Sequence, residues 1–101
     1  MSFDELITEY TKRVRNGLSY NDGALLNMFI LYGEDMAGFW DRYYAKSEEW
    51  VGYNFHKMFR QMPIIEIDPT GKLDMVVWYL LQDAPIFWKL VEEVTKEEKN
   101  D

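Results

Sequence analysis

The densest group of carboxylates in the sequence is Glu34, Asp35 and Asp41. Carboxylates bind hard cations or act as general acids and bases, so this group is a candidate metal or catalytic site. Glu34 and Asp41 are seven residues apart and would share one helical face, but a Mg²⁺ site needs several oxygens converging on one point. Acids at the start of a helix also stabilise its dipole. We interpret the group in this second way and predict no metal and no cofactor.

The remaining catalytic residue types are scarce. His56 is the only histidine and there is no cysteine, which excludes thiol catalysis, disulfides and clusters of His or Cys around a metal. The neighbours of His56 place it on the exposed side of a helix, where it is an ordinary surface histidine. The serines fit helix caps, and none lies in a nucleophile elbow or a glycine-rich phosphate loop. The sequence therefore predicts a protein that is not an enzyme.

Aromatic side chains are unusually frequent, with four Trp, seven Tyr and six Phe in 101 residues. A core of this size is not expected to enclose all of them, and exposed Trp and Tyr are typical of protein-binding surfaces. Four rings fall outside the apolar helical stripes and three acids lie near them; this predicted partner-binding set is Tyr44, Trp50, Tyr53, Trp88, Asp41, Glu48 and Glu49. The alternative is that these helices are buried on two sides and the rings belong to the core.

The chain is acidic, with 18 Asp and Glu against 11 Lys and Arg and a formal net charge of −7. Such a surface repels phosphate backbones, so we expect no direct nucleic-acid binding and an attraction to basic proteins. The simpler interpretation is that the charge only keeps the protein soluble.

No targeting or membrane segment is evident. The N-terminus has two acids in its first five residues and lacks a basic stretch followed by an apolar one. The longest uncharged run, residues 23–33, is far shorter than the ~20 apolar residues that span a bilayer. We expect a cytoplasmic protein with no membrane contact.

Helical spacing of apolar residues dominates the chain. Ser2 and Glu5 have the spacing of a capping box, and a first helix ends at Asn16–Gly17. Ala24 to Tyr32 is apolar nearly all round, which predicts a central helix packed on several sides. Further helices are predicted around 36–43, over 51–62 with Ser47 as its N-cap, and from Asp83 with Pro85 in the first turn.

The segment 64–79 has a different character. β-branched residues at 64–67 precede turn residues at 68–72, and 75–79 could pair back as a second strand. The competing interpretation is a helix, because residues 73–81 also fit helical spacing. We predict a mostly α-helical compact single domain over 1–101, with about four to five helices, one β-hairpin near 64–79 and a charged, frayed tail at 95–101; the alternative is an all-α bundle.

These features favour a non-enzymatic interaction module that binds a protein partner through aromatic anchors, with acids steering the encounter. Its more specific form is a small inhibitor of a basic, nucleic-acid-acting partner. In size and charge the chain is similar to phage-encoded inhibitors and toxin-immunity proteins. The alternatives are a structural subunit or homo-oligomer, and a small-molecule binder with a pocket between the third and fourth helices.

Overall fold

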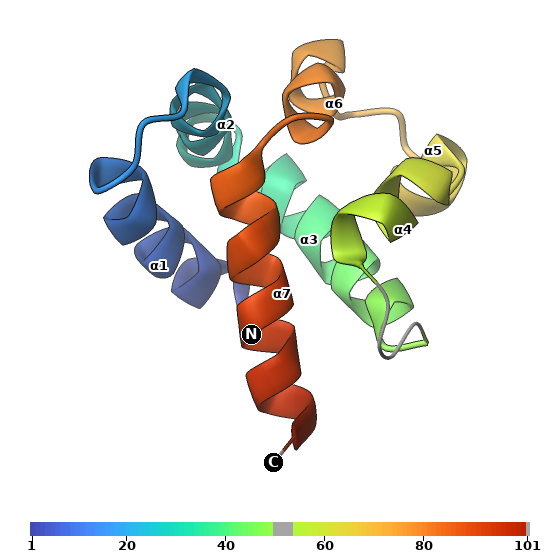
Figure 1. The fold of residues 1–101 in the computed structure, drawn as a ribbon. Coiled ribbons are helices and arrows are strands. Elements are labelled where there is room, and N and C mark those ends of the chain that lie inside the picture. The colour runs from blue at the N-terminus through green and yellow to red at the C-terminus, as the bar shows by residue number, and fades with distance from the viewer. Residues whose placement is uncertain (50–53, 101) are drawn as a thin grey trace.

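Every regular element in the described part of the chain is a helix in the computed structural model, which covers residues 1–49 and 54–100, with side chains described up to Thr95. The elements, in chain order, are α1 (Phe3–Arg15), α2 (Tyr20–Leu31), α3 (Gly33–Ser47), α4 (Phe55–Gln61), α5 (Ile64–Ile67), α6 (Met75–Leu81) and α7 (Pro85–Asn100). They form one body of 32 × 29 × 22 Å in which α2 and α6 lie side by side at the top, as drawn in Figure 1.

The prediction of a β-hairpin near 64–79 is wrong, and so is the prediction of about four to five helices, because the described part of the chain has seven; the all-α alternative fits. The segment instead contains two short helices, α5 and α6. A turn does form between them, with Gly71 at φ 65° and its N–H bonded to the carbonyl of Asp68. Asp74 then caps α6 by accepting from the N–H of Val76 at 2.8 Å. The helical period decides the outcome, because Val77, Trp78, Leu80 and Leu81 are buried together, whereas a strand would alternate.

Serine side chains cap the first two helices. Ser2 accepts from the N–H of Glu5, as the capping box predicts, and Ser19 caps α2 by accepting from the N–H of Asp22. The prediction for Ser47 is wrong. This residue ends α3 instead of starting the next helix, and its hydroxyl donates to the carbonyl of Tyr44. Glu48 and Glu49 therefore follow the carboxyl end of α3.

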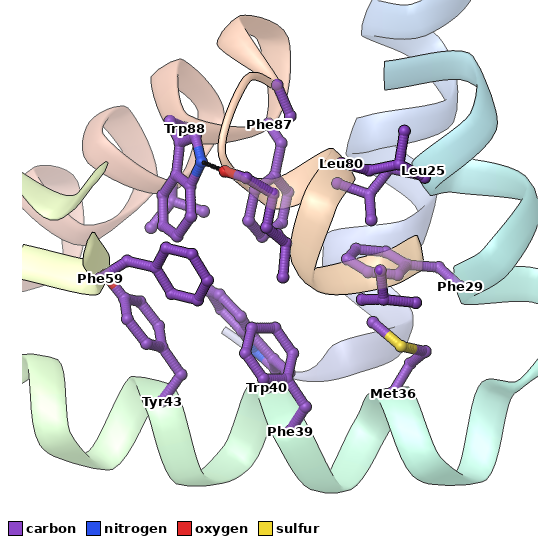
Figure 2. Close-up of a cluster of buried hydrophobic side chains, with 14 of the residues drawn as sticks. Leu25, Phe29, Met36, Phe39, Trp40, Tyr43, Phe59, Leu80, Phe87 and Trp88 are labelled. Atoms are coloured by element: carbon purple, nitrogen blue, oxygen red, sulfur yellow. Dashed lines mark hydrogen bonds between the residues drawn. The ribbon is translucent and has the colours of Figure 1, made fainter. Parts of the chain in front are cut away.

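The core is built on α3 and is largely aromatic. Met36, Phe39, Trp40 and Tyr43 recur at helical spacing, as predicted, and each is at most 2% exposed. Figure 2 shows rings from α4 and α7 meeting them from the other side. Phe59 lies 6.0 Å from Tyr43, and Phe87 lies 6.4 Å from Trp40, both edge-on and measured between ring centroids. Ten of the 15 rings in the described residues are buried in this way.

Candidate functional site

The structure describes two of the four predicted partner-binding rings, and neither of these two is fully exposed. Trp88 is only 5% exposed, and its indole N–H donates to the carbonyl of Leu81 at 2.8 Å (Figure 2). The expectation that Trp88 is exposed is therefore wrong, because α4 covers this second side of α7. Tyr44 is half-buried, with its ring 5.4 Å from that of Trp40. Trp50 and Tyr53 lie outside the described residues.

The three predicted acids are all exposed. Asp41 lies on α3, while Glu48 and Glu49 lie just beyond its end. Of the carboxylates considered for chemistry, Glu34 and Asp35 line a hollow of about 140 Å³ together with Arg42, Lys72 and others, and Asp41 is not among its residues. Among the described residues, no group of three His, Asp or Glu is placed to hold a metal ion. The hollow mixes acids with bases and lies against the 70–72 turn.

His56 is half-buried, not on an open surface. Its ring stacks on Trp88 at 5.2 Å with planes 12° apart, and its Nε2 is 2.9 Å from the carbonyl oxygen of Gln82. Burial lowers the pKa of His56 from its usual 6.5, and the positive charge of Arg60 lowers it further. The histidine is therefore part of the packing between α4 and α7.

Two buried carboxylates have structural partners. Asp22 accepts from the hydroxyl of Tyr10 at 2.7 Å and from the backbone N–H groups of Ile86 and Phe87 at 3.1 and 2.9 Å. A side chain of α2 thus caps the first turn of α7. Burial also raises the pKa of the Tyr10 phenol, and its hydrogen bond to Asp22 raises it further.

Asp68 organises the turn before α6. Its carboxylate accepts from the N–H groups of Leu73 and Lys72 and from the hydroxyl of Thr70, with the Arg42 guanidinium 3.9 Å away. Burial acts to raise the pKa of Asp68, but these hydrogen bonds and the nearby charge outweigh it and hold the pKa below its usual value. The hydrogen bonds of Asp68, like those of Asp22, thus stabilise the fold.

The feature left without a role in the fold is an exposed apolar surface on α2 and α6. We define the α2–α6 face by the seven large apolar side chains that these helices and the residue after α2 expose, each between 45% and 89%: Tyr20, Ile30, Leu31, Tyr32, Met75, Val76 and Tyr79. All three exposed rings in the described residues belong to it, and they are all tyrosines. Soluble monomers rarely expose so many large apolar groups together.

The two helices run in opposite directions. At one end, the side-chain amide of Asn21 donates to the carbonyl of Asp83 at 2.9 Å. At the other end, Tyr32 shares a hollow of about 160 Å³ with Asp74 and Val77. The end of α2 therefore lies beside the start of α6, and the two pack against each other along their length (Figure 1).

The α2–α6 face carries no charge. Asp22 is the only charged residue of α2 and it is fully buried, while α6 has none. Charged residues lie at the margin of the face, where Asp35, Lys72 and Asp74 line the hollow beside Tyr32, and Asp83 follows the end of α6. In a chain of which 29% of residues are charged, two adjacent helices that expose no charged side chain form a distinct surface.

Sequence reasoning did not assign this face, although its signal was present. The apolar run from Ala24 to Tyr32 predicted a helix packed on several sides. In the monomer, α2 buries Leu25, Leu26 and Phe29 but leaves Ile30 and Leu31 at 63% and 70% exposure. The all-round apolar pattern of this run thus exceeds what the fold of one chain buries.

A second, polar surface feature lies between α1 and α7. An open groove of about 690 Å³ is lined by the acids Asp4, Glu5 and Glu9, with Leu90 and Val94 beneath. Two of these acids already have partners within the chain. The hydroxyl of Ser2 donates to Glu5, and Lys12 forms an ion pair with Glu9 at 3.4 Å. The groove also contains the basic Arg13, which pairs with Glu93 of α7 at 2.7 Å.

Comparison with known proteins places the chain in a family. A family model described as "Family of unknown function (DUF7238)" matches residues 2–97, so the chain belongs to that family. No curated protein and no solved structure matches the chain. In the described part of the chain, none of the helices has the length and apolarity needed to cross a membrane.

Proposed function

We propose that this member of the DUF7238 family is a non-enzymatic interaction module that docks onto another polypeptide through the α2–α6 face. The observation that supports the proposal is the set of seven large apolar side chains exposed on two adjacent helices, and on the residue after α2, where no charged side chain is exposed. Apolar patches of this kind mark binding surfaces in soluble proteins.

The chemistry of the face suits a protein partner. Tyr20, Tyr32 and Tyr79 offer large, rigid contact areas with a hydroxyl that can hydrogen-bond at an interface. Met75 adds a flexible side chain that adapts to the partner's shape. Interface centres are depleted in charge and enriched in Tyr and Met, which is the composition found here.

An affinity capture with matched variants tests this proposal. Leu31→Lys and Met75→Glu each place a charge on the face, at a helix end where the dipole favours it. Ile65→Lys and Ile65→Glu are the controls, since Ile65 on α5 is also apolar and 73% exposed. Wild type and the controls should retain a partner, whether another protein or a differently tagged second copy, and both face variants should lose it. Identical captures from all five proteins would refute the proposal.

A second candidate function is the inhibition of a basic, nucleic-acid-acting protein in the cytoplasm. The acidic groove between α1 and α7 and the net charge of −7 favour this version, because acids can occupy a basic cleft. Replacing Asp4 and Glu9 together by Asn and Gln should then slow capture of the partner at low salt and have little effect at high salt. This candidate would be excluded if wild type and the double variant captured the partner equally fast and if salt had no effect on capture.

A further inference from the structure

We propose that the polypeptide covering the α2–α6 face is a second copy of this chain, so that the protein is a two-fold dimer joined through α2 and α6. This inference rests on the proposed docking function of the face and names its partner. Three observations favour a second copy over an unlike partner: the size of the face, its lack of charge, and the antiparallel arrangement of its two helices.

The exposed area is close to what a stable dimer needs. Aromatic side chains offer about 150–250 Å² and aliphatic ones roughly 60–120 Å² when fully exposed, so the three tyrosines and four aliphatic side chains of the face, at 45–89% exposure, present on the order of 500–800 Å². A standard interface takes roughly 800 Å² from each partner. The largest apolar patch on a typical monomer covers only about 300–600 Å².

The charge distribution selects the partner. Two copies, each with a net charge of −7, repel one another wherever their acids meet. At the α2–α6 face two such chains can meet without bringing acids against one another, because Asp22, the only acid of these two helices, is fully buried. A basic partner would gain no ionic contact from this face.

The arrangement of the helices suits self-association. In a two-fold dimer the same surface patch serves both subunits, so each exposed residue meets its counterpart or another member of the patch. A face made of two neighbouring antiparallel helices allows α2 and α6 of one copy to pack on α2 and α6 of the other, as one layer of two helices against another. Ile30 and Leu31 would then be covered, as the all-round apolar pattern of α2 requires.

Sedimentation velocity over a wide concentration range tests the dimer. Wild type should approach twice the chain mass of 12.1 kDa as concentration rises. Leu31→Lys and Met75→Glu should each weaken association about tenfold or more, since every substitution enters a two-fold interface twice. Ile65→Lys and Ile65→Glu should associate like wild type. Far-ultraviolet circular dichroism checks that all variants remain folded.

Salt dependence separates a second copy from a basic partner. Screening removes the repulsion between two acidic chains, so the association constant should stay level or rise as salt increases. Steep weakening of self-association with salt would overturn the proposal. A monomer at every concentration would overturn it too; if capture still depended on Leu31 and Met75 in that case, the docking function would stand with an unlike partner.

Distance measurement locates the interface. The chain has no cysteine, so a single nitroxide label can be attached at Val76→Cys on the face or at Ala45→Cys near the far end of α3. Both positions are exposed. The label-to-label distance between subunits should be shorter at Val76 than at Ala45. The opposite order in a dimeric protein would show that another surface forms the dimer and would overturn the proposal.

Discussion

Asp22 shows how much of this fold depends on one buried carboxylate. It lies on α2, accepts from Tyr10 on α1 and from the first amides of α7, and is fully buried. It therefore joins three helices. Because α7 carries Phe87 and Trp88 into the aromatic core, this carboxylate also sets the position of that core.

Replacing Asp22 with alanine should therefore cost about 3 kcal/mol or more of unfolding free energy, because several buried donors lose their acceptor. Asp22→Asn retains one acceptor oxygen and should cost less. Urea unfolding followed by tryptophan fluorescence measures both. The exposed Asp41→Ala is the control and should change stability by no more than about 0.5 kcal/mol. Equal stability of Asp22→Ala and Asp41→Ala would contradict the role assigned to Asp22.

His56 should make the fold sensitive to mild acid. Burial and the charge of Arg60 lower its pKa in the folded chain, an effect that the carbonyl of Gln82 and the charge of Asp83 oppose only in part. The unfolded chain therefore binds the proton more readily, and the contribution of neutral His56, fully present above pH 6.5, is lost as pH falls through the lowered pKa.

The measurement is a series of thermal unfolding midpoints from pH 7.5 down to 5.5, with the range set around the usual His pKa of about 6.5. His56→Gln should lose less stability than wild type over this range. Parallel pH profiles for the two proteins would show that His56 does not titrate differently in the folded and unfolded chains.

At the scale of elements, local signals in the sequence predict most of the helices but not the segment 64–81. The caps at Ser2 and the apolar spacing of α3 act within a few residues, so they are visible without the fold. The turn at 68–71 was also predictable, because its sequence contains Pro69 and Gly71. Gly71 does adopt the positive φ that such turns require. Whether Met75–Leu81 is strand or helix depends on packing against α2, which is a long-range contact.

Asp74 should be a measurable contributor to α6. Its side chain caps the helix through the N–H of Val76, and N-cap removal typically costs about 1 kcal/mol. Asp74→Ala should therefore lower the unfolding free energy by about that amount, and Asp74→Ser should restore most of it, as chemical denaturation can show. If the serine variant were no more stable than the alanine variant, capping would not be the reason for the loss.

The candidate site was predictable only in part. The all-round apolar pattern of α2 was evident in the sequence and implied more neighbours than the monomer supplies. The surplus of rings was evident too, but which rings reach the surface was not. Trp88 falls off the helical stripe of α7 and is still enclosed, because α4 packs a second side of α7 and places His56 and Phe59 against it.

At the scale of the whole molecule, charge and apolar surface are separated. Acids line the α1–α7 groove, whereas the α2–α6 face is uncharged. The proposed docking function would use the surface from which charge is absent. Tyrosines occupy the exposed ring positions, and the tryptophans whose side chains are described lie in the core.

Carbene footprinting of the face tests the central claim most directly, because it reports coverage whatever the partner is. The purified protein at high dilution is compared with the same protein in concentrated extract of cells that produce it. We predict that labelling of Met75 and Tyr79 falls in the extract while labelling of Ile65, also exposed in the monomer, stays constant. Unchanged labelling of Met75 and Tyr79, or an equal fall at all three residues, would contradict the claim that the α2–α6 face docks onto another polypeptide.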